Sequence, residues 1–303
     1  MKTLYVLFCV CIFGQQSIFA EKLFNKNPAD YLAVQTRNKQ IAVDLIKGDV
    51  GSLSRLYTVD CSYLPEFGPT INGRVRLSDF YRTWLKNSRI ITYSKSIYEV
   101  EPISNYLLET GNLTIHYKMG LDADREYRGK YMVIWKRDQA GQINIYAEAF
   151  GADHQVDATD VPYPAGDVSA NQPTEDFMVR QTLKPALQDY DKKVVSGVVA
   201  GDGASRAAGF TNDGIYMPHF DPMQIGMKAI RPYMLKTYYP HTISYVKDTF
   251  RELFDTGTFI LLTGHFHVIL NNPGKTSFDG NMLNLMKRGN DGKLLMYRQL
   301  AHN

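Results

Sequence analysis

Three histidines in the C-terminal half of the sequence have the residue type needed for proton transfer or metal binding. His265 and His267 are two residues apart in the segment TGHFHVIL, so on a strand both side chains would project from one face, and His219 lies upstream. Histidine can act as a general acid or base near neutral pH, and three imidazoles can coordinate a metal ion. Because one strand supplies only two ligands, we expect an acid, a base or a polar substrate contact here, and no metal or cofactor.

A tyrosine and an aspartate are the other candidates for catalysis. In the segment FTNDGIYMP, alternation along a strand places Asp213 and Tyr216 on opposite faces. If Asp213 is buried, desolvation raises its pKa and makes it a general base, and the Tyr216 hydroxyl can orient a substrate carbonyl. The alternatives are a turn carboxylate that accepts backbone N–H groups and a tyrosine that packs in the core.

The N-terminal half carries candidates for ligand binding. Tyr131 and Trp135 share one face of a predicted strand, and Glu148 lies on the next strand. Together they would line an apolar pocket with a single carboxylate, although such an aromatic stripe is more commonly part of a core. The full set of candidate ligand-binding residues in this half is Tyr63, Glu66, His116, Tyr131, Trp135 and Glu148.

The two halves of the chain repeat each other. YTVDCSYLPEFGPTINGR and FTNDGIYMPHFDPMQIGM match at seven of eighteen positions with an offset of 153 residues, where composition alone would give about one match. Glu66 and His219 occupy equivalent positions, so the two copies would form different pockets if this position faces a pocket, and solvent exposure is the alternative. Further on, Glu109 in ETG is matched with Asp255 in DTG at an offset of 146. A period of this size indicates a duplicated domain.

The first twenty residues have the three parts of a secretory signal. Lys2 precedes an apolar run from Leu4 to Phe13, and a small residue, Ala20, follows. Because an apolar run of about ten residues is too short to span a bilayer, we expect cleavage after Ala20 and a secreted or periplasmic protein. The mature chain would keep one cysteine, Cys61, and could form no internal disulfide. The net charge of +3, without a basic run, indicates neither nucleic acid nor a membrane as a partner.

Helical periodicity precedes strand patterns in each half. The first half predicts helices over about 28–47 and 50–57 and in RLSDFYRTWLKN, a short strand at DCSYLP, and then four strands. The second half predicts helices over about 177–199, from 203 and over 227–238, a strand over 213–217 and four further strands. Residues 152–176 contain three prolines and no apolar period, which is typical of a linker. We therefore predict a signal peptide over 1–20 and two tandem α+β domains over 21–151 and 177–303, each with three N-terminal helices packed in a curved antiparallel sheet.

The segments LYTVDCSYLP, GPTINGRVRLSDFY and GKYMVIWKRDQAGQINIY, with their counterparts in the second half, resemble the SnoaL-like branch of the nuclear transport factor 2-like superfamily. The resemblance implies a cone with a pocket inside, which often holds an Asp or His as acid or base. In the ketosteroid-isomerase branch the base is an Asp directly before the proline of the first strand. Leu64 and Met217 occupy that position here, so the resemblance does not imply steroid-isomerase chemistry.

Two hypotheses for function follow. In the first, the protein is an exported binding or accessory protein that holds a small, partly apolar molecule. In the second, it is a SnoaL-like isomerase, cyclase or dehydratase that transfers a proton next to a carbonyl, with Asp213 or His267 as base and Tyr216 as hydrogen-bond donor. The missing pre-proline carboxylate favours the first. We also expect the two domains to pair as an intramolecular pseudo-dimer, because members of this superfamily commonly pair through the outer face of the sheet.

Overall fold

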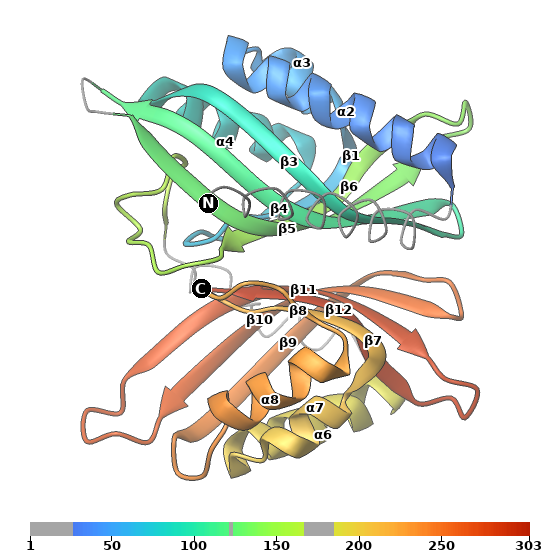
Figure 1. The fold of residues 1–303 in the computed structure, drawn as a ribbon, viewed down its shortest axis with the longest axis vertical. Helices are drawn as coiled ribbons and strands as arrows, with labels where there is room; N and C mark the ends of the chain where they lie inside the picture. Colours follow the sequence, from blue (N-terminus) through green and yellow to red (C-terminus); the bar gives the residue numbers. More distant parts are fainter. Residues whose placement is uncertain (1–26, 121–123, 167–184) are drawn as a thin grey trace, which may run out of the picture.

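Two domains of the same architecture follow each other along the chain (Figure 1). The computed structural model describes residues 27–120, 124–166 and 185–303, so the predicted signal peptide lies outside the described residues. No helix in these ranges is long and apolar enough to cross a membrane. The elements of domain one are α2 (Pro28–Lys47), α3 (Val50–Arg55), β1 (Tyr57–Leu64), β2 (Ile71–Asn72), α4 (Arg74–Asn87), β3 (Ser88–Ile103), β4 (Tyr106–Met119), β5 (Arg125–Arg137) and β6 (Ile143–Ala152).

Domain two repeats this order of elements. They are α6 (Pro185–Ala200), α7 (Gly203–Ala208), β7 (Phe210–Met217), β8 (Gln224–Ile225), α8 (Met227–Thr237), β9 (Ile243–Asp255), β10 (Phe259–Leu270), β11 (Ser277–Arg288) and β12 (Leu294–His302). The predicted α+β class and the three helices before the main strands are confirmed in both domains. The part of the predicted helix over 177–184 lies outside the described residues.

Each sheet has six strands and is mixed, whereas the sequence predicted an antiparallel sheet. The strand orders are β2-β1-β6-β5-β4-β3 and β8-β7-β12-β11-β10-β9. The first long strand runs parallel to the last one, with Ser62 opposite Ala147 in domain one and Ile215 opposite Arg298 in domain two. The pattern of side chains along one strand does not encode the direction of its neighbour, so this pairing escaped prediction.

The repeated GD dipeptides are explained by local helix geometry. Gly48 follows α2 with a φ of 71°, a left-handed conformation that favours glycine, and Gly201 follows α6 with a φ of 66°. Asp49 then caps α3 by accepting a hydrogen bond from a backbone N–H at 2.9 Å, and Asp202 caps α7 at the same distance. The dipeptide therefore ends one helix and starts the next in both domains.

The repeat alignment needs one correction. Strand pairing shows that the offset of 153 continues through β4 and β10, so that Gly111 corresponds to Gly264. The match of Glu109 with Asp255 was wrong, because Glu109 is buried in the first part of β4 whereas Asp255 ends β9 at a turn. A Cβ on Gly111 would lie 2.2 Å from a backbone oxygen of β3, which explains why glycine stands there.

The segment predicted as a linker packs against domain one in its described part, residues 153–166. Val161 and Tyr163 are 1% and 4% exposed and belong to the core of that domain. The carbonyl of Pro162 accepts a hydrogen bond from the Ser88 hydroxyl at 2.5 Å. Residues 167–176 of the predicted linker lie outside the described residues.

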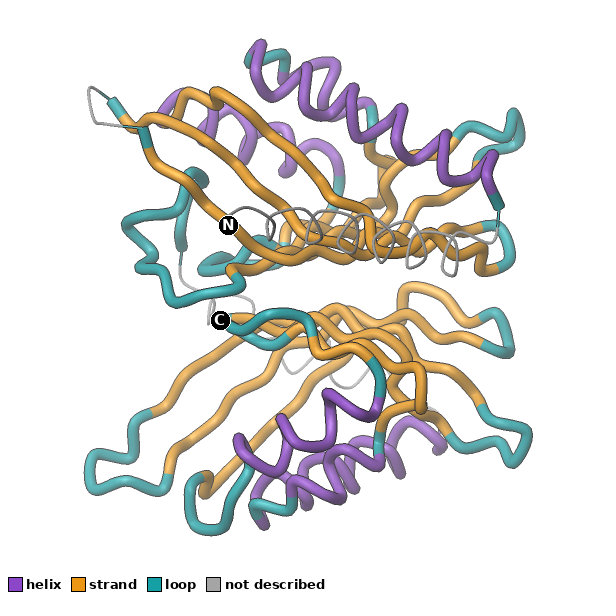
Figure 2. The backbone as a smooth tube through the Cα atoms, in the orientation of Figure 1, coloured by secondary structure: helices purple, strands orange, loops and turns teal. Residues whose placement is uncertain are grey.

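The two sheets face each other, and the helices of each domain lie on the far side of its own sheet (Figure 2). Apolar side chains from both outer faces form a continuous core between the domains. Its buried members are Leu64, Ile103, Tyr106, Leu108, Met132, Ile134, Tyr146, Ala147 and Ala149 from domain one and Ile215, Met217, Leu261, Leu283, Leu285, Tyr297 and Leu300 from domain two.

Polar contacts fix the position of one sheet on the other. Arg298 donates two hydrogen bonds to the Glu99 carboxylate, at 2.6 and 2.7 Å, and both side chains are buried. Tyr106 stacks on Phe254 with ring centroids 4.1 Å apart. This apolar interface with a buried bidentate ion pair has the character of a permanent contact.

Candidate functional site

The cone of domain two is hollow. Its sheet and helices line a cavity of about 360 Å³, a volume in the range of small-molecule sites. The cavity walls are mainly apolar and come from α6 and all four long antiparallel strands. The apolar lining residues are Val194, Val198, Ile243, Val246, Phe250, Phe266, Val268, Phe278, Met282 and Ala301.

Two carboxyl groups face this cavity. Asp191 lies on α6 and Asp248 lies on β9, and the two carboxyl groups are close enough to shift each other's pKa. Burial raises the pKa of Asp191 to about 6. Burial and the neighbouring Asp191 charge together raise the pKa of Asp248 to about 7. Two carboxyls in contact cannot both ionise easily, so the pair shares a proton close to neutral pH.

A buried arginine lies at the same end of the cavity. Arg206 on α7 is 5% exposed and donates from Nη2 to the Gln299 Oε1 at 2.6 Å. Its guanidinium lies over the Phe210 ring, 4.9 Å from the centroid. Among the described residues, Arg206 Nη1 and the neighbouring Tyr190 hydroxyl have no well-formed hydrogen bond. Buried donors without partners are costly, and they suit a site that a ligand completes.

The cone of domain one is filled. The corresponding space measures about 10 Å³ and is lined by aromatic rings such as Tyr63, Tyr81, Trp84 and Phe150. The buried Glu148 accepts hydrogen bonds from Lys95 Nζ at 2.9 Å and from the Tyr57 hydroxyl at 2.5 Å. This space is too small for a ligand.

A second buried carboxylate in domain one is fully bonded. Glu109 accepts from Asn38 at 2.6 Å, from the Tyr131 hydroxyl at 2.7 Å and from the Trp135 indole at 2.8 Å. Burial raises the pKa of Glu109, an effect that the nearby Lys95 charge and these hydrogen bonds oppose. Both oxygens of the Glu109 carboxylate are hydrogen-bonded within the domain, and the network serves its core.

Strand register shows which residues replace one another between the cones. Lys95 lies opposite Leu113 of β4, and Asp248 lies opposite Phe266 of β10, the equivalent position. The two cones thus carry different side chains at equivalent positions, and the rings of Tyr131 and Phe150 are replaced by the smaller Met282 and Ala301. The exchanged pairs are Asn38 and Asp191, Leu53 and Arg206, Lys95 and Asp248, Tyr131 and Met282, Glu148 and Gln299, and Phe150 and Ala301.

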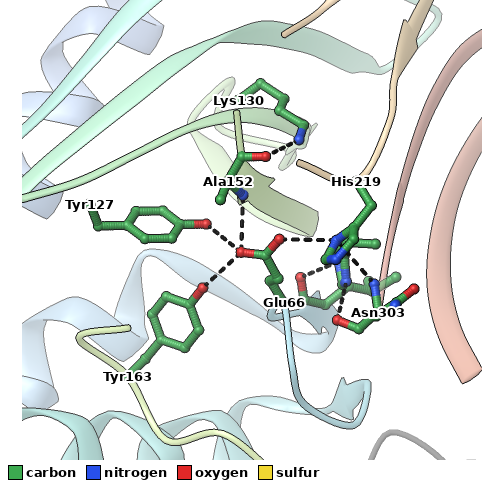
Figure 3. A network of polar contacts seen from close by, with 9 residues as sticks. Glu66, Tyr127, Lys130, Ala152, Tyr163, His219 and Asn303 are labelled. Atoms are coloured by element: carbon green, nitrogen blue, oxygen red, sulfur yellow. Dashed lines mark hydrogen bonds and ion pairs between the residues drawn. The ribbon is translucent and has the colours of Figure 1, made fainter. Parts of the chain in front are cut away.

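The other end of the domain-two cavity reaches the domain interface. His219 lines the cavity, and its Nδ1 lies 3.2 Å from Oε1 of the Glu66 carboxylate in domain one (Figure 3). Glu66 is fully buried and also accepts from the Tyr127 hydroxyl at 2.9 Å and the Ala152 N–H at 3.0 Å. Burial tends to raise the pKa of Glu66, but the His219 hydrogen bond and nearby histidines outweigh it, so the pKa is lowered and Glu66 remains a carboxylate.

Two other buried bases surround this contact. Lys130 donates from Nζ to the Ala152 carbonyl, and burial lowers its pKa to about 8. His302 lies 3.2 Å from the Leu64 carbonyl through Nε2, and burial lowers its pKa to about 4. His302 is therefore neutral at physiological pH, and it ties the C-terminal strand to domain one.

Of the five residues predicted for catalysis, only Tyr216 and His219 line the cavity. Asp213 is exposed, so it is not the buried general base of the first hypothesis for this residue. His265 and His267 alternate with Phe266, which faces the cavity, and both contact Asp279 at 3.0 Å on the opposite face of the sheet. The structure thus separates them from His219, and no group of three metal-ligating side chains occurs among the described residues.

The six residues predicted to bind a ligand in domain one form no pocket large enough for a ligand. Tyr63, Tyr131 and Trp135 are buried in the core of the cone, and Glu148 is paired inside it. Glu66 lies at the domain interface, so it is not the solvent-exposed residue of the alternative prediction. His116 is half-exposed and lies 3.5 Å from Glu126. The alternative reading of the aromatic stripe as core packing is the one that the structure supports.

Sequence reasoning missed Asp191, Arg206 and Asp248. The signal was present in the repeat, because the unbroken offset of 153 sets Arg206 against Leu53 and Asp248 against Lys95. At equivalent positions of a duplicated fold, a charge that replaces an apolar residue, or a reversal of charge, indicates that the two copies have different functions. The slip to an offset of 146 hid the strand part of this comparison.

Comparison with protein-family models gave no match, and comparison with curated proteins gave none either. Among solved structures, the chain is similar to a conserved protein from Planctomyces limnophilus (22% identity, 41% of this chain, 95% of that chain, TM-score 0.38). It is also similar to an NTF2-like protein from Cytophaga hutchinsonii (17% identity, 42% and 98%, TM-score 0.35) and to ActVI-ORFA from Streptomyces coelicolor (17% identity, 38% and 92%, TM-score 0.33). Each match covers about two fifths of the chain, and at these identities the likeness concerns the fold alone.

Proposed function

We propose that this protein binds a small, partly apolar molecule in domain two and that domain one serves as its covalently attached partner. The observation that carries the proposal is the contrast between a cavity of about 360 Å³ in domain two and one of about 10 Å³ in domain one. A fold that is closed by aromatic rings in one copy and left open in the other has kept the opening at a cost in packing. Arg206, Asp191 and Asp248 give the open cavity a polar end that orients a ligand.

Native mass spectrometry of the protein, compared with its denatured mass, tests this proposal. We expect a bound small molecule that is lost on denaturation. The variant Ala301→Phe introduces the ring that fills the equivalent position of domain one, and it should abolish this binding. Asp213→Asn, at an exposed position outside the cavity, is the matched control and should retain the ligand. Retention by Ala301→Phe would place the ligand elsewhere and refute the proposal.

A second candidate function is proton transfer in the same cavity. The Asp191–Asp248 pair favours it, because carboxyls with pKa values of about 6 and about 7 can give and take a proton near neutrality. The reaction class matches the isomerase, cyclase or dehydratase hypothesis, with Asp248 in the role first assigned to Asp213 or His267. Acetophenone in D₂O is a suitable probe: the enzyme reading expects deuterium exchange at its methyl group that is lost in Asp248→Asn. Equal exchange in the wild type and in Asp248→Asn would exclude catalysis by Asp248 and leave ligand binding as the function.

We also propose export of the protein, on the basis of the N-terminal pattern alone. Lys2, the apolar run that follows and Ala20 support a cleaved signal. N-terminal sequencing of the protein from its native source tests this proposal. A mature terminus at Glu21 is expected, and an intact Met1 would contradict it.

A further inference from the structure

The cavity of domain two is not completed by domain two alone. His219 and Asn303 line its interface end, and both are held by residues of domain one. The Phe67 N–H donates to the Asn303 carbonyl at 2.6 Å, and the Glu66 carboxylate lies 3.2 Å from His219 Nδ1. Figure 3 shows Glu66 between its own tyrosines and His219. The two equivalent positions of the repeat thus contact each other across the interface.

We propose that Glu66 is a positioning residue for this cavity: its carboxylate holds the His219 proton on Nδ1, so that Nε2 faces the ligand as a hydrogen-bond acceptor. The ligand class that fits is an apolar molecule with a hydroxyl or N–H group. This inference rests on the proposed binding function. It goes beyond that function by assigning part of the site to the domain whose own cone is closed.

The contacts around the imidazole determine which nitrogen carries the proton. A carboxylate accepts hydrogen bonds only, so the contact with Glu66 requires a proton on His219 Nδ1. The Asn303 N–H donates toward Nδ1 at 3.5 Å, which requires Nδ1 without a proton, whereas Glu66 Oε1 has no other hydrogen-bond partner among the described residues. The two contacts at Nδ1 exclude each other, and we assign the proton by the shorter one, 3.2 Å from a charged carboxylate. Among the described residues, no hydrogen bond to His219 Nε2 is formed, and this is the nitrogen left for a ligand.

The carboxylate itself is well secured. Its second oxygen, Oε2, accepts from Tyr127 at 2.9 Å, from the Ala152 N–H at 3.0 Å and from Tyr163 at 3.4 Å. Oε1 is thereby aimed at His219. The arrangement of a buried carboxylate that orients a histidine, which in turn contacts the ligand, is the same physical device that fixes tautomers in catalytic and metal sites.

Nuclear magnetic resonance of ¹⁵N-histidine-labelled protein tests the proposal without a ligand, because long-range ¹H–¹⁵N correlations report which ring nitrogen is protonated. We expect His219, identified by its loss in His219→Gln, to be in the Nδ1–H form. Glu66→Gln should convert it to a mixture. Tyr127→Phe, which removes a contact to Oε2 only, should leave it unchanged. An Nε2–H form in the wild type, or no change in Glu66→Gln, would overturn the proposal. If Glu66→Gln does not fold, the tautomer of His219 in the wild-type spectrum decides whether the proposal holds.

Binding of decanol and of its methyl ether tests the ligand class. We expect the alcohol to bind about fivefold more tightly than the ether, because one neutral hydrogen bond contributes about this much to affinity. This preference should vanish in Glu66→Gln and persist in Tyr127→Phe. Equal binding of the two probes would overturn the hydroxyl assignment while leaving the proposed binding function intact. Failure of both probes to bind would count against the binding function. The tautomer of His219 would still be decided by the nuclear magnetic resonance experiment, which needs no ligand.

Discussion

The two cones differ in what fills them and not in how they are built. Helices and strands follow the same order, and the same glycines end the long helices at positive φ. Domain one places Tyr131 and Phe150 where domain two places Met282 and Ala301, and the cavity volume changes from about 10 to about 360 Å³. The backbone therefore sets where a pocket can form, and a few side-chain volumes decide whether one exists.

The buried charges differ in the same way. In domain one Lys95 is paired with Glu148, and Glu109 accepts three hydrogen bonds. In domain two Asp248 faces another carboxyl, and Arg206 keeps a nitrogen without a partner among the described residues. Satisfied networks contribute to stability, whereas unsatisfied ones are tolerated where a ligand uses them. We therefore expect substitutions of the buried charged residues to lower the stability of domain one and to leave the stability of domain two unchanged or higher.

The largest effect should come from breaking the ion pair of domain one. Lys95→Met leaves the Glu148 carboxylate buried without its cation, which should lower the free energy of unfolding by about 3–5 kcal/mol. The equivalent change in domain two, Asp248→Asn, should not destabilise the protein at pH 8, because it removes a carboxyl that burial disfavours in its ionised form. Chemical denaturation of both variants measures the difference. Equal losses would show that the two cones are energetically alike.

Opening the filled cone should also be costly. Phe150→Ala introduces the residue found at the equivalent position of domain two, and the loss of packing should cost about 3 kcal/mol or more. Denaturation followed by tryptophan fluorescence measures this loss. A cost below about 1 kcal/mol would mean that the core collapses into the space, which occurs only where packing is loose.

The carboxyl pair of domain two should make stability depend on pH. The folded pKa of Asp248 is raised to about 7, so the folded state binds a proton that the unfolded state releases. Stability is therefore full below the unfolded value of about 4 and falls as pH rises through 7, by on the order of 1–3 kcal/mol. Denaturation midpoints at pH 5 and pH 8 measure this loss. Asp248→Asn should flatten the dependence, and an unchanged slope in that variant would assign the effect to other groups.

The smallest effect should come from the aspartates that repeat at the first strand. Asp60 and Asp213 are both exposed, so Asp60→Asn and Asp213→Asn should each change stability by less than about 0.5 kcal/mol. Thermal denaturation checks this, and ligand retention in native mass spectrometry provides the second readout. Loss of the ligand in Asp213→Asn alone would restore that residue as a member of the site.

The sequence by itself determined the duplication, the fold class and most element boundaries. Helix 28–47 was predicted at its observed limits, because Pro28 at the start and Gly48 at the end are local signals. Alternation also placed Tyr216 and Asp213 on opposite faces, and the structure agrees. These features depend on neighbours within a few residues along the chain, which is the information that a sequence displays directly.

Only the tertiary structure decided which cone is open and which side chains meet. Asp191 and Asp248 are separated by helices and strands in the sequence, yet each shifts the pKa of the other because α6 lies against β9. Glu66 and His219 are 153 positions apart, and they meet because two equivalent loops are brought together by the packed sheets. Cavity volume and the partners of buried charges are sums over many distant contacts, and no local pattern in the chain encodes them.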